Sequence, residues 1–368
     1  MHENISESRL GGCTLGGAIA VTAYIKNAIT VVHAPKGCVH QTFSMYHAML
    51  ANESIPSIPT FVTSNLTDRE VIFGGETALS DALDKATEKN PELILVISSC
   101  IPETIGDDCF AVCNSHKNAD KIIYIPTSGF LGGKAEDGEN TALISIAKSI
   151  KKQNIKPMTV AIIGEKNLES EIEENFKEIS RLLKLLGITI IIRYCHAITK
   201  DEMRALGEAA FFISRDERVE RAGTEIAKQF GRPLVQGYPS GLSSEIQFLK
   251  DCGRACNLST ESIRIAVETE LNLQNEMLNE FKELRGLAIH ISDEPFEGTY
   301  AVAKEVMERL NIREEIGGRE VKLPFYLPVG IAGIRKMLYL WRREKRNNGA
   351  SRRDAFLKIP MKYHEENT

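Results

Sequence analysis

The sequence lacks the short motifs that identify the commonest hydrolases and nucleotide-dependent enzymes. It contains no H-E-x-x-H, no G-x-S-x-G and no C-x-x-C, which excludes the simplest zinc-protease, serine-hydrolase and dithiol-redox chemistries. No G-x-G-x-x-G follows an expected strand. The nearest approach to a phosphate-binding loop is SGFLGGKA at 128–135, where Ser128 replaces the first glycine and Ala135 replaces the hydroxyl residue that binds Mg²⁺. We therefore expect no direct ATP or NAD site in this chain.

Long apolar runs and a strong excess of one charge are also absent. No uninterrupted run of about 18 apolar residues occurs, and residues 1–10 contain no apolar segment of a secretory signal. The 45 basic and 50 acidic side chains give a net charge of -5, which argues against a general nucleic-acid binder. We expect a soluble, cytoplasmic protein with neither a nucleic-acid nor a membrane partner.

The pattern of apolar residues predicts an α/β protein. With 368 residues, 43% of them hydrophobic, the chain is long enough for two or three domains. Short apolar runs at 29–34, 58–63, 93–99 and 121–127 alternate with helical patterns at 38–51, 76–89 and from about 103. Strands that are apolar throughout and separated by helices are typical of a parallel sheet covered on both faces. We predict Rossmann-like, doubly wound parallel-sheet domains.

Three domains are expected, the third truncated. The first covers residues 1–155, and after the polar segment 151–157 the strand pattern restarts in a second domain at 156–258. The remainder, 259–368, begins with a helix predicted from Ser259 to about Leu284, followed by a strand at 287–292 and a helix at 298–310. Its basic tail, 335–353, has two interpretations, a solvated helix face or a docking surface for an acidic partner or substrate carboxylates.

Five of the eight cysteines are expected to pack in the core. Cys109 and Cys113, like Cys252 and Cys256, are four residues apart, so each pair shares one face of a helix. Cys195 follows an apolar strand run. Cysteine is among the most buried residue types and behaves as a small hydrophobe, which favours core packing for all five.

The other three cysteines, Cys13, Cys38 and Cys100, lie in turns where helices are expected to begin, in GGCTLGG, HAPKGC and SSCIPE. Loops that follow parallel strands gather at the carboxyl edge of a sheet, where ligands bind. A helix N-terminus there lowers the pKa of a thiol, and iron-sulfur clusters require thiolates. The residues alone leave two interpretations open, three ligands of an iron-sulfur cluster or three unrelated turn cysteines.

At these cysteines the sequence resembles component 1 of the nitrogenase-like reductases, the family of the molybdenum-iron protein and the dark-operative protochlorophyllide reductase. The matching motifs are GGCTLGGAIA, HAPKGCVHQ, SSCIPETIGDD and IPTSGFLGG, in the family's order, and the resemblance covers roughly residues 10–250. It implies that Cys13, Cys38 and Cys100 bind an iron-sulfur cluster, of the 4Fe-4S type, at a subunit interface. It also implies a separate ATP-hydrolysing iron protein as electron donor, which agrees with the missing phosphate-binding loop.

Within this family the short chain is most similar to the catalytic components that reduce a nickel tetrapyrrole on the path to coenzyme F-430. The resemblance thus implies a nickel tetrapyrrole substrate and a homodimer. The alternatives are a nitrogenase-like reductase of another tetrapyrrole or of a sulfur compound, and a non-catalytic scaffold on which a metal cluster is assembled.

A two-fold axis would constrain the cluster, because a group on the axis takes equal numbers of ligands from each chain. Three candidate thiols per chain leave open whether one is spare or whether each chain binds its own cluster with another group as fourth ligand. The catalytic proton donors are not identified. His33, His40, His47 and Glu103 lie near the cysteine loops, and each has a structural interpretation beside the catalytic one.

Overall fold

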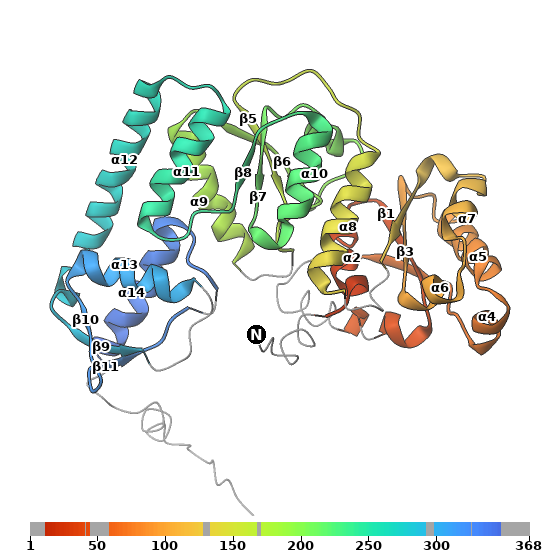
Figure 1. Cartoon of the computed structure of the whole chain (residues 1–368), viewed down its shortest axis with the longest axis horizontal. Coiled ribbons are helices and arrows are strands. Elements are labelled where there is room, and N and C mark those ends of the chain that lie inside the picture. The colour runs from red at the N-terminus through yellow and green to blue at the C-terminus, as the bar shows by residue number, and fades with distance from the viewer. Residues whose placement is uncertain are drawn as a thin grey trace, which may run out of the picture. The chain divides into compact units, whose positions relative to one another are not determined.

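The computed structural model describes residues 12–40, 42–44, 59–127, 133–167, 171–291, 298–324 and 326–346. The chain forms two compact units (Figure 1). The first consists of Met1–Tyr238 and Phe248–Ile263, and the second of Pro239–Gln247 and Arg264–Thr368. The first two predicted domains therefore share one unit, while the predicted boundaries at 155 and 258 stay a prediction.

The first sheet contains four parallel strands in the order β2-β1-β3-β4. They are β1 (Ala28–His33), β2 (Thr60–Thr63), β3 (Leu93–Ser98) and β4 (Ile122–Pro126). Every residue of β3 is buried, which explains its uninterrupted apolar sequence LILVIS. All four strands match the predicted runs, so the prediction of a doubly wound parallel sheet is confirmed for this part of the chain.

The helices around the first sheet are α4 (Asp68–Phe73), α5 (Glu76–Thr87), α6 (Cys100–Ile105) and α7 (Cys109–Ser115). The helix predicted near 76–89 corresponds to α5, whereas α6 begins three residues earlier than predicted, at Cys100 itself. Of the helix predicted over 38–51, residues 36–40 and 42–44 are helical, and 45–51 lie outside the described residues.

The second sheet repeats the strand order of the first, as β6-β5-β7-β8. Its strands are β5 (Thr159–Ile163), β6 (Thr189–Tyr194), β7 (Phe211–Ser214) and β8 (Leu234–Gln236), and its helices include α8 (Ala135–Lys148), α9 (Ile172–Leu185), α10 (Glu220–Phe230) and α11 (Leu242–Ala255). In each sheet the winding direction changes between the first strand in sequence and the third. Ligand sites in doubly wound sheets lie outside the carboxyl ends of the strands at this point.

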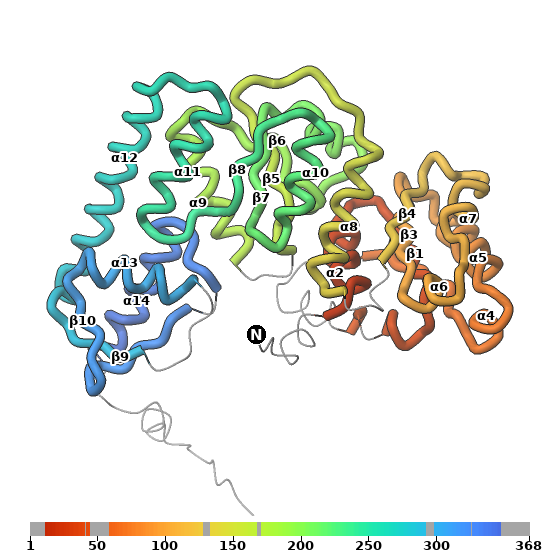
Figure 2. The backbone as a smooth tube through the Cα atoms, in the orientation of Figure 1, coloured from red at the N-terminus to blue at the C-terminus, as the bar shows by residue number. Residues whose placement is uncertain are grey.

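One hydrophobic core is shared by both sheets of the first unit. It contains residues of α2 (Thr14–Thr22), such as Ile19, together with Ile97 of the first sheet and Phe212 of the second. Helix α2 has the sequence TLGGAIAVT, which is apolar on every side, as expected for a helix buried all around. Figure 2 shows α2 and α8 next to each other between the two sheets.

Buried amide side chains reinforce this arrangement. Asn167 donates to the Ala20 carbonyl of α2 at 3.0 Å, and Asn140 of α8 donates to the Arg218 carbonyl at 2.6 Å. Asn140 also accepts from the Ala222 N–H of α10 at 2.8 Å. Both central helices are therefore hydrogen-bonded to the second sheet's loops and helices.

Two glycines allow the backbones of α2 and α8 to touch. A Cβ atom at Gly17 would lie 1.7 Å from the Ala135 carbonyl oxygen, and one at Gly138 would lie 1.8 Å from the Thr14 carbonyl oxygen. Any side chain at either position would therefore force the helices apart. The contact lies beside an isolated antiparallel bridge between Cys13 and Lys134. The position of Cys13 consequently depends on this helix crossing.

The second unit contains a three-stranded parallel sheet in the order β10-β9-β11. Its elements are β9 (Ala288–Ile291), β10 (Arg313–Glu314), β11 (Arg319–Val321), α13 (Thr299–Leu310), α14 (Gly330–Arg346) and most of α12 (Thr260–Asn279). The predicted strand and helix of the truncated third unit correspond to β9 and α13. Glu305 of α13 accepts from the backbone N–H groups of Leu242 (2.9 Å) and Ser243 (2.7 Å), where α11 begins.

The described part of the basic tail is largely paired within the chain. Arg335 of α14 contacts Glu280 at 3.0 Å, and Arg342 pairs with Glu283 and lies 4.1 Å from the ring centre of Phe281. These contacts favour the structural interpretation over a docking surface as far as Arg346, and residues 347–353 lie outside the described range. No helix in the described part of the chain combines the length and apolarity needed to cross a membrane.

Replacement of Gly17 by Ala tests the helix crossing. Gly17→Ala is expected to lower the free energy of unfolding by about 2–3 kcal/mol, because the new methyl group meets backbone rather than a movable side chain. The matched control is Gly16→Ala, since no atom lies within 4 Å of the added Cβ there. That change is expected to be neutral or stabilising by up to about 1 kcal/mol. Urea denaturation of both variants measures the difference, and equal effects would contradict the proposed backbone contact.

Candidate metal centre

Cys38 and Cys100 follow the two neighbouring strands between which the winding of the first sheet changes. His33 of β1 and Ser98 of β3 are paired in register, and the Ser99 N–H donates to the His33 carbonyl at 2.9 Å. Cys100 is the first residue of α6, and Cys38 lies in the helical stretch 36–40. The parallel pairing of β1 with β3 thus brings both cysteine loops to one edge of the sheet.

Cys13 reaches this edge from a different direction. It is the N-cap residue of α2, it is exposed, and its carbonyl accepts from the Gly17 N–H at 3.2 Å. The neighbouring Thr14 hydroxyl donates to the Thr127 carbonyl at 2.7 Å, just beyond the end of β4. The start of α2 is therefore held at the carboxyl edge of the first sheet.

The three thiols lie within electrostatic reach of one another. Burial raises the pKa of the Cys38 thiol, and negative charge on Cys100 and on Cys13 raises it further. Cys38 and Cys100 are partly buried, and all three are free thiols. The structure brings together the three cysteines that the sequence singled out, and their binding of a cluster stays a prediction.

The remaining cysteines have different surroundings. Cys109, Cys113, Cys195 and Cys252 are buried, which confirms core packing for these four, whereas Cys256 is only partly buried. Burial raises the pKa of both the Cys109 and the Cys113 thiols to about 12. These thiols are consequently protonated at neutral pH and poor ligands.

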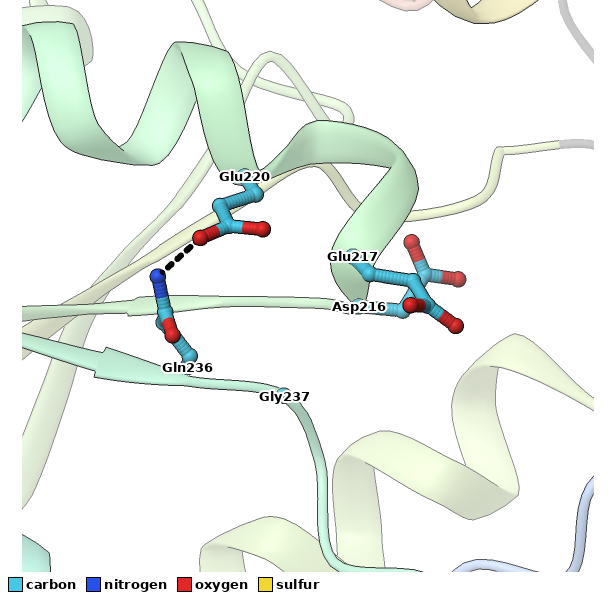
Figure 3. Close-up of a pocket in the computed structure, with 5 residues that line it drawn as sticks. All are labelled: Asp216, Glu217, Glu220, Gln236 and Gly237. Atoms are coloured by element: carbon cyan, nitrogen blue, oxygen red, sulfur yellow. Dashed lines mark hydrogen bonds between the residues drawn. The ribbon is translucent and has the colours of Figure 1, made fainter. Parts of the chain in front are cut away.

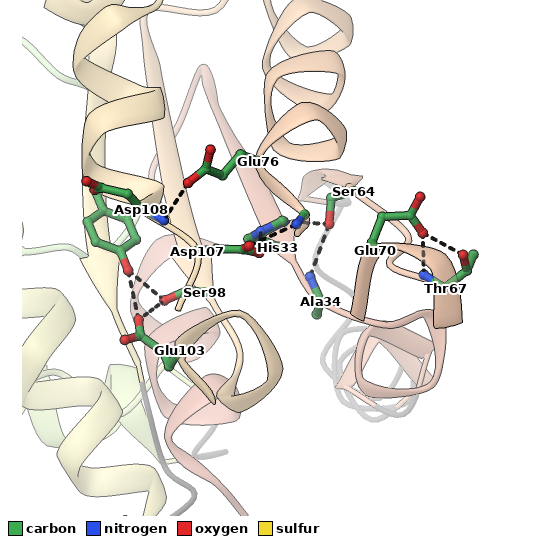
Figure 4. A network of polar contacts seen from close by, with 12 residues as sticks. His33, Ala34, Ser64, Thr67, Glu70, Glu76, Ser98, Glu103, Asp107 and Asp108 are labelled. Atoms are coloured by element: carbon green, nitrogen blue, oxygen red, sulfur yellow. Dashed lines mark hydrogen bonds and ion pairs between the residues drawn. The ribbon is translucent and has the colours of Figure 1, made fainter. Parts of the chain in front are cut away.

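A buried polar network holds the end of β1 (Figure 4). His33 is fully buried, with Nδ1 at 2.8 Å from Ser64 Oγ and Nε2 at 3.1 Å from Asp107 Oδ2. The other oxygen of Asp107 accepts from the Gly75 N–H at 2.8 Å. Burial lowers the pKa of His33, against the opposing effect of Asp107. His33 therefore joins the strand end before Cys38 to the segment after α6, as its structural interpretation predicted.

Glu103 has a similar structural role. It lies in the first turn of α6, and its Oε1 accepts from the Ser98 hydroxyl at 2.6 Å and the Tyr124 hydroxyl at 2.8 Å. It thus links α6 with the ends of β3 and β4. Of the other two histidines considered as proton donors, His40 is exposed in the stretch 36–40, and His47 lies outside the described residues.

The donor set of this edge suits an iron-sulfur cluster. Within the described ranges no group of three or more His, Cys, Asp or Glu side chains converges closely enough to hold a single metal ion. A cluster makes a different demand, because each of its iron atoms binds its own thiolate and the ligands stand further apart. A set of three free thiols matches the preference of iron-sulfur centres for sulfur ligands.

The second sheet carries polar groups at its carboxyl edge that no sequence motif indicated. Buried Glu165, just after β5, accepts from the Tyr238 hydroxyl at 2.9 Å and from Arg193 Nε at 3.2 Å. Burial raises the pKa of Glu165, and the charge of Arg193 opposes this shift. A separate pocket of about 200 Å³ lies at the ends of β7 and β8 (Figure 3). Its lining is Asp216, Glu217, Glu220, Gln236 and Gly237, and it contains none of the three cysteines.

The arrangement of two doubly wound sheets with thiols at one carboxyl edge corresponds to a known class of redox proteins. Residues 13–308 match the family model of the nitrogenase component 1 type oxidoreductases. The chain belongs to this family.

Relatives within the family have several functions. The chain is 30% identical over 235 residues to the nitrogenase iron-molybdenum cofactor biosynthesis protein NifE of Clostridium pasteurianum, covering 61% of this chain and 49% of that protein. It is 25% identical over 289 residues to the nitrogenase molybdenum-iron protein alpha chain of Methanothermococcus thermolithotrophicus (74% and 59%). It is 26% identical over 244 residues to one subunit of the light-independent protochlorophyllide reductase of Prosthecochloris aestuarii (65% and 45%). The chain spans about half the length of these curated relatives.

A solved structure shows the same fold. The structure titled nitrogenase Cp1 at pH 5 superposes with a TM-score of 0.60 and 18% sequence identity, covering 82% of this chain and 63% of that chain. This similarity confirms the predicted Rossmann-like α/β architecture.

Alkylation of the cluster-free protein tests the division between loop and core cysteines. At pH 8 iodoacetamide is expected to modify exposed Cys13 first, whereas Cys109 and Cys113 should remain unmodified until the protein unfolds. The reason is that about one in 10⁴ of such thiols is ionised at this pH. Peptide mass spectrometry over time gives the order of modification. Modification of Cys109 as fast as that of Cys13 would contradict the structural division.

Proposed function

We propose that the chain is the catalytic iron-sulfur component of a nitrogenase-like, ATP-dependent two-component reductase. In this proposal Cys13, Cys38 and Cys100 bind an iron-sulfur cluster, of the 4Fe-4S type. The observation that carries the proposal is the convergence of three free thiols from α2, β1 and β3 at one sheet edge. When bound, such a cluster supplies one-electron transfer at low potential.

The protein's own residues would hold the site rigid. The Cys38 loop follows a strand end held by His33, Ser64 and Asp107, and the Cys100 helix is held by Glu103. Rigid ligands favour electron transfer because the site need not rearrange when the charge changes. The buried histidine and the hydrogen-bonded Glu103 would serve as supports for the site, with protons supplied by other groups or by the substrate.

Partner proteins form part of this proposal. A separate ATP-hydrolysing iron protein would deliver the electrons, because the chain carries no phosphate-binding loop of its own. Helix α4 contacts α6, which begins at Cys100, and exposes Val71, Ile72 and Phe73, the last with 82% of its surface accessible. Neighbouring exposed apolar side chains favour a protein partner at this face. We also propose a homodimer in the cytoplasm, where eight free thiols remain reduced.

The proposed reaction is the reductive cyclisation of Ni-sirohydrochlorin a,c-diamide, a nickel tetrapyrrole, in coenzyme F-430 biosynthesis. The similarity to a protein of a protochlorophyllide reductase supports a tetrapyrrole substrate, and equally supports reduction of another tetrapyrrole. The second candidate function is a scaffold on which a metal cluster is assembled. It is favoured by the similarity to a protein named for iron-molybdenum cofactor biosynthesis.

The cluster ligands can be tested by replacement. The triple variant Cys13→Ala, Cys38→Ala, Cys100→Ala is expected to lose nearly all iron and acid-labile sulfide after anaerobic reconstitution, because no thiolate remains at the sheet edge. Cys256→Ala is the matched control, since Cys256 is a partly exposed free cysteine assigned to no site, and it should keep the iron content of the native chain. Iron and sulfide analysis measures both. Full iron content in the triple variant would disprove the assignment.

Turnover separates the two candidate functions. The chain, its cognate iron protein, ATP, a reductant and the nickel tetrapyrrole are expected to give a change in the tetrapyrrole absorption spectrum that depends on all five. The chain should retain its iron throughout, whereas a scaffold would transfer iron to an acceptor protein and leave the tetrapyrrole unchanged. An unchanged spectrum with iron retained would reject this substrate and leave reduction of another molecule.

A further inference from the structure

Two hydroxyl groups connect the segment of Cys13 to the segment of Cys100. The Thr14 hydroxyl donates to the Thr127 carbonyl at 2.7 Å, and the Thr127 hydroxyl donates to the Ser98 carbonyl. Thr14 is adjacent to Cys13, and Ser98 lies two residues before Cys100. Thr14, Thr127 and Ser98 are all at least 96% buried. The connection therefore crosses the edge of the sheet beneath the proposed cluster site.

The backbone around Ser98 explains why a side chain supplies the donor. Pro126 is the residue of β4 paired with Ser98, and proline has no N–H to donate. The Ser98 carbonyl accepts the hydroxyl of the next residue, Thr127, instead. A buried carbonyl without a partner costs free energy, so the Thr127 hydroxyl meets a requirement created by the proline.

The Thr14 hydrogen bond fixes a coordinate that the helix crossing leaves free. The contact of Gly17 and Gly138 sets the distance between α2 and α8, because backbone meets backbone there. It does not by itself prevent a small shift of α2 along its own axis. The bond from Thr14 to the end of β4 opposes that shift, and with it a displacement of Cys13 relative to Cys100.

We propose that the Thr14–Thr127–Ser98 hydrogen bonds are a positioning element that keeps Cys13 and Cys100 at the separation a bound iron-sulfur cluster requires. This inference rests on the proposed function, since it concerns the proposed cluster ligands. The two hydrogen bonds act in series, so loss of either one disconnects Cys13 from Cys100. The threonines themselves do not contact the cluster's iron in this proposal.

The test uses Thr14→Val and Thr127→Val in the full-length, cluster-loaded chain. Valine has nearly the shape of threonine but lacks the hydroxyl. The matched control is Thr22→Val, because Thr22 is equally buried on the same helix and its hydroxyl makes no hydrogen bond within the described structure. The rate of iron loss to a chelator under anaerobic conditions and the EPR spectrum of the reduced cluster are measured, together with the unfolding midpoint of each cluster-free variant.

Each of the two variants is expected to lose iron about fivefold to tenfold faster than the native chain, the equivalent of about one hydrogen bond, and to broaden the EPR signal. The double variant should be no faster than either single variant, because the bonds act in series. Thr14→Ser and Thr127→Ser should restore the native rate and spectrum, since serine retains the donor. Thr22→Val should match the native chain.

Three results would overturn the inference. Iron loss from Thr14→Val at the rate of Thr22→Val would show that the hydrogen bond does not position the ligands. A native EPR spectrum combined with a lowered unfolding midpoint would assign the threonines a purely structural role. A native chain that binds no iron at all would refute the proposed function itself, which separates that failure from failure of the positioning alone.

Discussion

The contact between the backbones of α2 and α8 is the constraint on which the first unit depends. Gly17 and Gly138 let the two helices meet without side chains between them, and the pair then fills the space between two separate sheets. A larger residue at either position would separate the helices and open the core that both sheets share. The same contact sets where α2 begins, and so where Cys13 lies. Packing at the centre of the unit and ligand geometry at its edge are thus a single problem.

The carboxyl edge of the first sheet uses its ionisable groups for support. His33 is held without access to solvent between Ser64 and Asp107, and Glu103 accepts two hydrogen bonds. A group that already has its partners and is shielded from water exchanges protons poorly. The sheet edge therefore combines reactive thiols with unreactive supports, which suits a site whose chemistry is the transfer of electrons.

The extent to which the sequence predicts this structure differs between elements for physical reasons. Strand β3 was predictable because burial on both faces requires an unbroken apolar run, LILVIS. Strand β8, with three residues, is too short to show any period. The loop cysteines could be separated from the core cysteines because glycine and proline mark turns, while pairs four residues apart mark a helix face. The roles of Thr14, Thr127 and His33 could not be found, since a Thr or His in an apolar run has the same local pattern whether or not a partner more than a hundred residues away completes it.

The hydrogen bond between Thr14 and Thr127 spans 113 positions of the chain, and this has a consequence for the order of folding. Contacts between distant residues form late, because the intervening chain must first be brought into a closed loop. A nascent chain that has emerged only as far as Cys100 contains all three loop thiols but not the strand β4 against which α2 is placed. Metal delivered at that stage would meet thiols without a defined spacing. Maturation of the site is therefore tied to completion of the first sheet, and the chain acquires a geometry able to select a cluster only after its first 127 residues have folded together.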